Sequence, residues 1–139
     1  MINFFSEDID FSLSNPHIQT QWISSIISSH KYSLEEINYI FCSDEYLLQI
    51  NQEHLNHDYY TDIITFDNSE NAHVIESDIF ISIDRVKENA KNQKTSFDQE
   101  LNRVMIHGVL HLLGFGDKTE EEKKVMREKE DACLSLLEN

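Results

Sequence analysis

Two histidines and an aspartate in the run His107-Gly-Val-Leu-His111-Leu-Leu-Gly114-Phe-Gly-Asp117 have the types and spacing of metal ligands. Residues four apart share one face of a helix, so His107 and His111 are expected one turn apart. Gly114 is the residue type that ends a helix in a left-handed conformation, which lets the chain double back and present Asp117. Two imidazoles and one carboxylate leave a fourth position for water, as in catalytic zinc sites. The run therefore predicts a catalytic Zn²⁺ centre.

The helix that carries the histidines has a complete apolar face without them. At about 100° per residue, Glu100 and Arg103 share the stripe of the two histidines. The opposite side is apolar and is formed by Leu101, Met105, Val109 and Leu112. The alternative is a pair of partly buried histidines bonded to carbonyls. It would be favoured for an isolated pair, but not for a pair followed by a glycine and a third ligand.

The residue after the first histidine limits the chemistry of the metal. Zinc proteases carry a glutamate there, which acts as the general base. Here the position is Gly108, so peptide hydrolysis by that route is not expected. Activation of water and Lewis-acid polarisation of a scissile bond by the metal remain available.

Three segments together resemble the YbeY endoribonuclease family. They are the run from His107 through Phe115, Thr61-Asp-Ile-Ile-Thr-Phe66 and Ser77-Asp-Ile-Phe-Ile81, and the resemblance extends from about residue 35 to the end. It implies a zinc-dependent, single-strand-specific endoribonuclease acting in 3′-end maturation of small-subunit (16S) ribosomal RNA and in ribosome quality control. The partners implied are single-stranded RNA, ribosomal RNA and the small ribosomal subunit, and no DNA is expected.

The chain departs from the family pattern at two positions. The resemblance implies three histidine ligands, of which the first two fall on His107 and His111 and the third on Asp117. A carboxylate oxygen also binds zinc, so we expect the site to hold one zinc ion. The aspartate alters the metal preference of the site, and another divalent metal is possible. A family arginine falls on Leu55. Arg103 is the candidate to hold a phosphate in its place, unless it is an exposed helix charge paired with a neighbour such as Glu100.

Further polar residues lie in the family motifs upstream of the metal helix. Thr61, Asp62 and Asp78 are expected to orient the metal helix or the RNA backbone. The alternative is that they bond the amides at strand ends. His54 and His57 precede the Asp62 strand and could approach a substrate, although exposed loop histidines are common.

The charge distribution is uneven along the chain. The net charge of −15 opposes nonspecific nucleic-acid binding, which depends on lysine and arginine. Residues 1–84 contain 15 acidic residues and one basic residue, whereas residues 85–139 contain 11 acidic and ten basic residues. One face of the second part could therefore meet RNA. The alternative is a set of solvated helix faces with ion pairs such as Glu120–Lys124.

Cellular location and redox state follow from the same composition. No apolar run approaches the roughly 20 residues of a membrane span, and the first residues lack the pattern of a signal peptide. Cys42 and Cys133 lie far apart and are expected to be two packed thiols. We therefore expect a cytoplasmic protein that does not associate with a membrane.

The pattern of elements predicts an α+β fold and a single domain over residues 1–139. We expect a small mixed sheet of about four strands packed with about five helices, one of them a zincin-like metal helix. The expected strands are Ile2–Phe5, Ile37–Cys42, Asp62–Phe66 and Glu76–Ile83, with a polar hairpin loop at Asp67–His73. The expected helices begin at Pro16, after a cap at Ser43 or Asp44, at Asp84, after Ser96, and at the capping box Thr119–Glu122, the last ending near Leu137.

The sequence is compatible with three functions. The first is the metal-dependent endoribonuclease. The second is a ribosome-associated binding factor for RNA or protein with a mainly structural metal site, favoured by the acidic composition and the missing arginine. The third, a metalloprotease, is disfavoured by Gly108.

Overall fold

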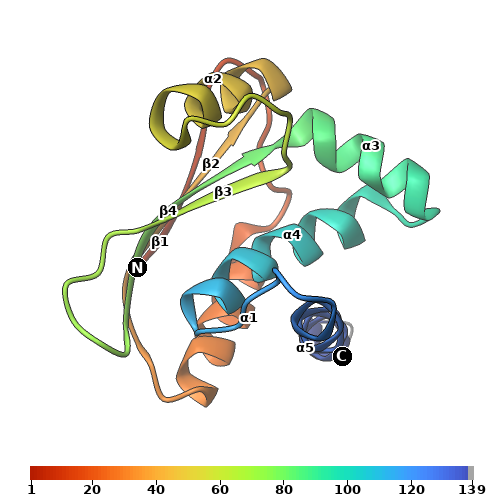
Figure 1. Ribbon diagram of the computed structural model, residues 1–139. Helices are drawn as coiled ribbons and strands as arrows, with labels where there is room; N and C mark the ends of the chain where they lie inside the picture. Colours follow the sequence, from red (N-terminus) through yellow and green to blue (C-terminus); the bar gives the residue numbers. More distant parts are fainter. Residues whose placement is uncertain (138–139) are drawn as a thin grey trace.

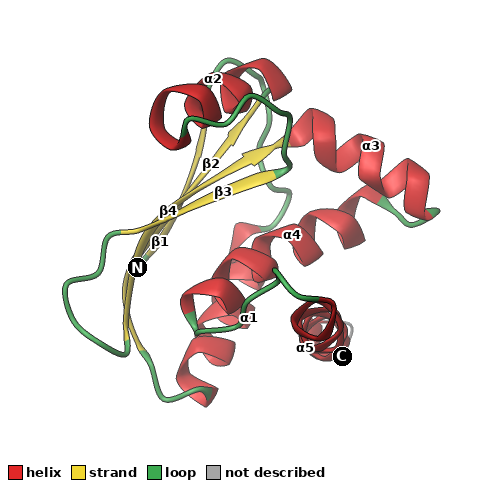
Figure 2. Cartoon of the chain, viewed as in Figure 1, coloured by secondary structure: helices red, strands yellow, loops and turns green. Residues whose placement is uncertain are grey.

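A four-stranded sheet with helices on both faces forms the core of the protein in this computed structural model (Figures 1 and 2). The structure describes residues 1–137, so the last two residues of the domain expected over 1–139 lie outside the described range. In chain order the elements are β1 (Ile2–Ser6), α1 (Pro16–Ser29), β2 (Ser33–Cys42), α2 (Asp44–Leu55), β3 (Ile63–Asp67), β4 (Val74–Ser82), α3 (Ile83–Gln93), α4 (Phe97–Leu112) and α5 (Glu120–Leu137).

The sheet is mixed, which confirms the α+β prediction. Its strand order is β1-β2-β4-β3. The pairs β1–β2 and β2–β4 are parallel, whereas β3 and β4 form an antiparallel hairpin. Parallel neighbours require crossover connections, and α1 lies between β1 and β2 in the chain. The polar loop at residues 68–73 is the expected hairpin connection.

Alternation along the strands assigns each side chain to one of two faces. In β2, Ile37, Tyr39 and Phe41 are buried on one face, and Asn38 and Ile40 point to the other. Helices α1 and α4 pack against the first face, and α5 packs on α4. Helix α2 covers part of the second face, with its own small apolar cluster.

Helix α4 approaches the sheet closely because it carries a glycine at the contact. A Cβ atom at Gly108 would lie 3.0 Å from Ile63 Cδ1, 3.1 Å from Thr65 Oγ1 and 3.3 Å from Ile79 Cδ1. A side chain at this position would force the side chains of Ile63, Thr65 and Ile79 to shift. The position that carries a glutamate in zinc proteases thus faces the packed sheet here.

Several strand boundaries differ from the expected ones: β1 and β3 by one residue at one or both ends, and β2 and β4 by more. Strand β2 begins at Ser33 rather than Ile37, because its early part pairs with β4, where Ser33 is opposite Val74. Acidic residues there interrupt the apolar pattern, and the register of the β2–β4 ladder shifts by one residue between Leu34 and Glu36. Strand β4 begins at Val74 rather than Glu76 and ends at Ser82, whose side chain caps α3.

The expected helix caps are confirmed. Ser96 Oγ accepts a hydrogen bond from the Gln99 amide at 3.1 Å at the start of α4. At α5, the Glu122 amide donates to Thr119 Oγ1 at 3.0 Å, and the Thr119 amide donates to Glu122 Oε1 at 3.1 Å. These reciprocal bonds form the predicted capping box and fix where α5 begins.

Helix α5 is tied to the rest of the core at its C-terminal half. The Trp22 indole donates to the Cys133 carbonyl at 2.8 Å, which links α1 to α5. Cys42 and Cys133 are buried free thiols, as expected. Within residues 1–137, no helix combines the length and apolar character needed to cross a membrane.

Candidate metal centre

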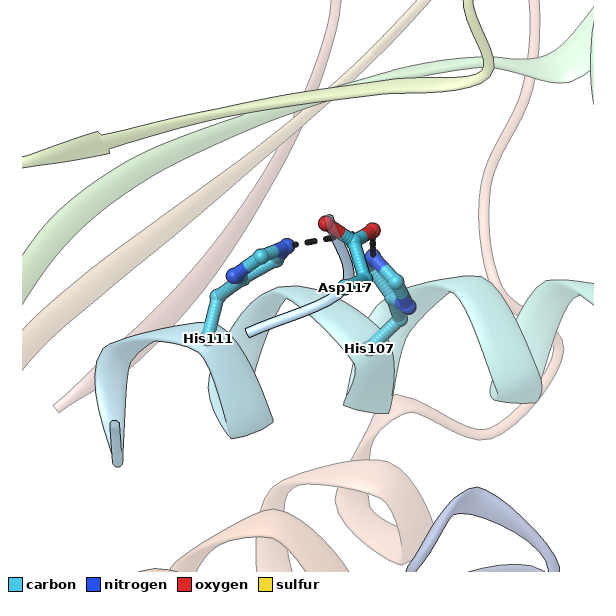
Figure 3. Close-up of side chains that lie close together, drawn as sticks. All are labelled: His107, His111 and Asp117. Carbon is cyan, nitrogen blue, oxygen red and sulfur yellow. Dashed lines mark ion pairs between the residues drawn. The ribbon is translucent and has the colours of Figure 1, made fainter. Parts of the chain in front are cut away.

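The three residues predicted as metal ligands converge above helix α4. The helix ends at Leu112, and Gly114 adopts the left-handed conformation with φ of 105°. The chain then passes back over α4, and Figure 3 shows Asp117 between the two imidazole rings. The distance from Asp117 Oδ2 to His107 Nε2 is 3.3 Å, and that to His111 Nε2 is 3.5 Å.

These distances fit a metal ion. In a tetrahedral site with bonds of about 2.0–2.1 Å, neighbouring ligand atoms lie about 3.3–3.4 Å apart. One ligand atom from each of His107, His111 and Asp117 lies within 4.8 Å of the others. The donor set of two imidazole nitrogens and one carboxylate oxygen suits Zn²⁺ and other first-row divalent ions. The three residues can therefore hold a metal.

A cleft of about 450 Å³ opens over the three ligands. It lies between α4, β3 and the segment that follows α2. Its lining consists of Asn51, Leu55, His57, Tyr59, Thr61, Asp62, Ile63, Ile64, Thr65, Asp67, His107, His111, Leu112 and Asp117. Among the described residues, no lysine or arginine contributes to this lining.

Glu130, which no sequence motif indicated, contacts His107 on the side of the ring away from Asp117. Its Oε2 lies 2.7 Å from His107 Nδ1, and its Oε1 accepts a hydrogen bond from Arg103 Nη1 at 3.0 Å. Glu130 is 5% exposed. It lies in the buried stripe of α5 with Met126 and Cys133, and an acid in an apolar stripe was the signal that could have identified it.

The surroundings of His107 favour a positive charge on its ring. Burial of the imidazole opposes protonation. The hydrogen bond and charge of Glu130, with the charges of Asp117 and Asp62, outweigh burial and raise the pKa of His107 above its ordinary value. The same negative groups would attract a metal cation to this position.

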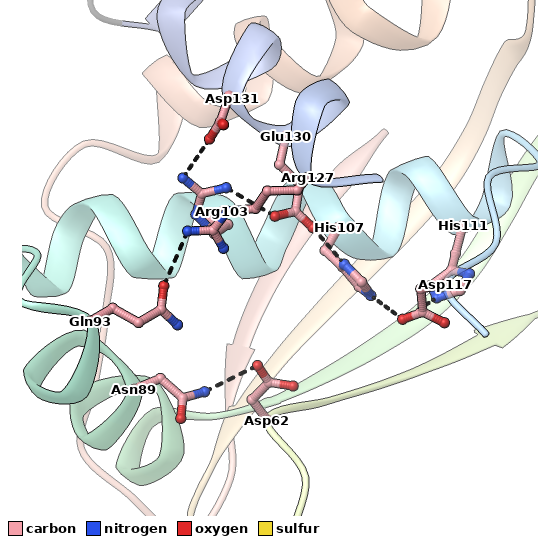
Figure 4. Close-up of polar contacts among 10 residues, drawn as sticks. All are labelled: Asp62, Asn89, Gln93, Arg103, His107, His111, Asp117, Arg127, Glu130 and Asp131. Carbon is pink, nitrogen blue, oxygen red and sulfur yellow. Dashed lines mark hydrogen bonds and ion pairs between the residues drawn. The ribbon is translucent and has the colours of Figure 1, made fainter. Parts of the chain in front are cut away.

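Arg103 lies beneath the ligands rather than in the cleft. Its Nη1 donates to Glu130 at 3.0 Å and its Nη2 to Asp131 at 2.7 Å, both on α5. Burial opposes its charge, but these two acids outweigh burial and raise its pKa. Arg103 is 9% exposed, so it is not the exposed helix charge of the alternative interpretation. Figure 4 shows the line of contacts from Asp131 to Asp117.

Thr61 and Asp62 are expected to orient the metal helix or the RNA backbone, and the structure places them at the metal cleft. Both line the cleft. Asp62 Oδ2 accepts a hydrogen bond from Asn89 on α3 at 3.3 Å. Burial raises the pKa of Asp62, while the nearby charge of His107 acts in the opposite direction. A carboxyl group with a raised pKa therefore lies in the same cleft as the three candidate ligands.

Asp78 does not join the metal ligands, which corrects the expectation that it orients the metal helix. In the hairpin it pairs with Phe66, whereas Thr65 and Ile79 face Gly108 on α4. Successive residues of a strand alternate between faces, so Asp78 lies on the opposite face of the sheet. There it accepts a hydrogen bond from Asn38 at 3.0 Å.

The two histidines that precede β3, His54 in the last turn of α2 and His57 in the loop after it, lie in different cavities. His57 lines the metal cleft. His54 lies with Asp78 in a second cavity of about 470 Å³ between α2 and the sheet. Only His57 is therefore placed to approach a substrate bound at the metal ligands.

Comparison with known proteins identifies relatives over nearly the whole chain. The model of the family described as Endoribonuclease YbeY matches residues 2–138. A protein from Cytophaga hutchinsonii named Endoribonuclease YbeY is 58% identical over 135 residues, covering 97% of this chain and 94% of the relative. One of the same name from Christiangramia forsetii is 50% identical over 136 residues, covering 98% and 94%.

A solved structure shares the fold. The solution structure of a protein from Thermotoga maritima superposes with a TM-score of 0.69 at 26% sequence identity, covering 99% of this chain and 89% of the other. Both the family match and the relatives span the metal-ligand run, the hairpin and α5. The chain therefore belongs to the Endoribonuclease YbeY family.

Proposed function

We propose that this protein is a metal-dependent endoribonuclease that cleaves single-stranded RNA at the His107, His111 and Asp117 centre. The convergence of these three ligands at distances that fit a zinc ion carries the proposal. The relatives are named endoribonucleases, which supports RNA as the substrate. We further propose that the RNA is small-subunit ribosomal RNA, matured at its 3′ end and monitored in ribosome quality control.

A divalent cation bound there would polarise a phosphodiester and activate a water molecule. The cation would also attract the negatively charged phosphates of the substrate. No lysine or arginine among the described residues lines the cleft to do so. Two neutral imidazoles and one carboxylate leave a divalent site with a net charge of about +1. That is one charge less than three histidines would leave, so phosphate attraction is expected to be weak.

Aromatic rings at the cleft offer another source of RNA affinity. His57 and Tyr59 stack with ring centroids 5.1 Å apart, and the Tyr59 hydroxyl lies 3.0 Å from His57 Nδ1. Tyr59 is 56% exposed. Unpaired bases of single-stranded RNA stack on such rings, whereas paired bases cannot reach them. Stacking is less sensitive to an acidic surface than phosphate contact is.

Cleavage of defined RNAs tests the proposal. An end-labelled single-stranded RNA, its duplex form and a fragment spanning the small-subunit rRNA 3′ end are incubated with the Zn²⁺-loaded protein. The same reactions contain EDTA or the Asp117→Ala variant as controls. We expect cuts in the single strands only, lost with EDTA and with the variant. Cuts that persist in both controls would refute metal-dependent cleavage.

The competing function has a different outcome in the same experiment. The acidic composition, and the lack of lysine and arginine among the described residues of the cleft lining, favour a binding factor with a structural metal. That function predicts RNA retention without cuts, at a metal content of one ion per chain. Chelation would then lower the melting temperature and leave the RNA intact.

A further inference from the structure

The two histidines of the centre are held in different ways. The second ring nitrogen of His107 contacts the buried Glu130 of α5 at 2.7 Å. Within residues 1–137, no group has a hydrogen bond to Nδ1 of His111; its Nε2 lies 3.5 Å from Asp117 Oδ2 and its ring meets the ring of His107 edge to face. The side chain of His111 is 34% exposed, compared with 21% for His107. Within the described residues, His107 therefore has polar contacts on both ring nitrogens, whereas His111 has one on Nε2 alone.

The contact with Glu130 decides which nitrogen of His107 can bind a metal. A buried carboxylate can only accept, so His107 Nδ1 carries the hydrogen and Nε2 presents its lone pair. That Nε2 is the atom 3.3 Å from Asp117 Oδ2. The opposite tautomer would leave a hydrogen on Nε2 pointing into the ligand set. Glu130 thus selects the tautomer that metal binding requires.

Arg103 stabilises the buried carboxylate of Glu130. Glu130 is 5% exposed, and burying a charged carboxylate without a partner is energetically costly. The guanidinium of Arg103 donates to Glu130 Oε1, which leaves Oε2 for His107. Figure 4 shows Arg103 directed away from Asp117 and toward α5. Its guanidinium already donates hydrogen bonds to Glu130 and Asp131. It is therefore poorly placed to bind a phosphate.

We propose that Glu130, held by Arg103, is a positioning residue that fixes His107 as a metal ligand and makes the metal centre dependent on helix α5. This inference rests on the proposed metal centre, and it assigns to Arg103 an indirect role in place of phosphate binding. The ligand run and α5 are separate elements of the chain, and Glu130 joins them.

Metal affinity of matched variants tests the inference. Zinc affinity is measured by competition with a chromophoric chelator for the parent, Glu130→Gln and Asp131→Asn. Glutamine has one oxygen and one NH₂ group, so it cannot accept from both Arg103 and His107. We expect Glu130→Gln to lose affinity by about 10–100-fold, the range for residues that support a ligand. Asp131→Asn alters the neighbouring, more exposed ion pair and is expected to change affinity less than about fivefold.

A second variant addresses loss of folding. Replacing the pair together, Arg103→Met with Glu130→Leu, leaves no buried charge and keeps similar volume, so the fold should survive. Circular dichroism checks that it does. We expect this double variant to lose zinc affinity as Glu130→Gln does. Parent-like zinc affinity in a folded double variant would overturn the inference.

A spectroscopic readout in the metal-free protein separates this inference from the proposed function. The ¹⁵N shifts of the imidazoles at alkaline pH report which ring nitrogen carries the hydrogen. We expect His107 to be the Nδ1–H tautomer in the parent and to lose that preference in Glu130→Gln, with His111 unchanged. An unchanged His107 tautomer would refute the positioning role, even in a parent that binds zinc. A parent that binds no zinc would refute the proposed centre, whatever the tautomer.

Discussion

Two cavities of similar size lie on opposite faces of the sheet, and only one of them can hold a metal. The cleft over α4 measures about 450 Å³ and the cavity under α2 about 470 Å³. Each has histidine and aspartate in its lining: His107, His111 and Asp117 in the first, His54 and Asp78 in the second. In the first, the ligand atoms converge. In the second, Asp78 is bonded to Asn38 and Asn68.

The difference comes from how the two helices meet the sheet. Helix α4 lies close to β3 through Gly108 and presents two histidines one turn apart. Helix α2 packs through larger side chains, Tyr46, Leu47 and Ile50, in a separate apolar cluster. Residue types and cavity volume are therefore weaker indicators of a metal site than fixed spacing on a rigid element. The predictions below test this contrast, from the largest expected effect to the smallest.

Removing one carboxylate from each face of the sheet should affect zinc affinity on the α4 face only. Asp117→Ala leaves two protein ligands, so we expect zinc affinity to fall by more than about 100-fold, beyond the range for loss of a supporting residue. Asp117→His should retain zinc, because imidazole binds at a similar distance. Asp78→Ala should bind like the parent. Metal analysis by mass spectrometry after gel filtration measures all three. Stoichiometric zinc in Asp117→Ala would show that Asp117 is a turn residue and not a ligand.

The close approach of α4 to the sheet should make Gly108 intolerant of side chains. In Gly108→Ala, overpacking costs about 1–3 kcal/mol, offset by about 1 kcal/mol of better helix propensity. In Gly108→Glu we expect the free energy of unfolding to fall by about 3 kcal/mol or more, because a charge is also forced against the sheet. Urea denaturation measures both, with the exposed Glu128→Ala on α5 as control. A Gly108→Glu protein as stable as the parent would contradict the close packing.

A cation added to the metal cleft should strengthen phosphate contact. Leu55 lines that cleft and is 40% exposed. We expect Leu55→Arg to raise the cleavage rate by about tenfold, the lower end for a charge-assisted hydrogen bond, without changing metal content. Gln49→Arg places the same charge in the cavity under α2 and should leave the rate unchanged. Equal rates in both variants and the parent would show that phosphate charge does not limit cleavage.

Surface lysines should have the smallest effects. Lys118 follows Asp117 directly, whereas Lys31 lies between α1 and β2. We expect Lys118→Glu to weaken RNA binding and to reduce the salt dependence of log affinity by about 0.7, the value for one phosphate on a single strand. Lys31→Glu should leave both unchanged. Fluorescence anisotropy at several salt concentrations measures them, and equal effects would exclude a localised RNA face.

The sequence by itself predicted which three residues converge as candidate ligands, and it predicted most elements of the fold. The spacing of His107, His111 and Asp117 around Gly114 is local, and local geometry follows from helix periodicity and turn chemistry. The capping box at Thr119 is local for the same reason. Alternating apolar residues identified the sheet strands, although the acidic start of β2 concealed Ser33–Glu36, because its pairing with β4 is nonlocal.

Only the tertiary structure decided which polar residues meet. Asp62 and Asp78 occupy similar motif positions, yet they lie on different sides of the sheet. Asp62 lies in the bend before β3 and lines the metal cleft, whereas Asp78 lies within β4 and faces the cavity under α2. Glu130 reaches His107 only because α5 packs across α4, and no spacing along the chain predicts that contact. Arg103 shares the histidine face of α4, but the acids of α5 lie closer to it than the cleft does, and they bind its guanidinium. Residue spacing fixes neighbours on one element, whereas contacts between elements depend on how their faces pack.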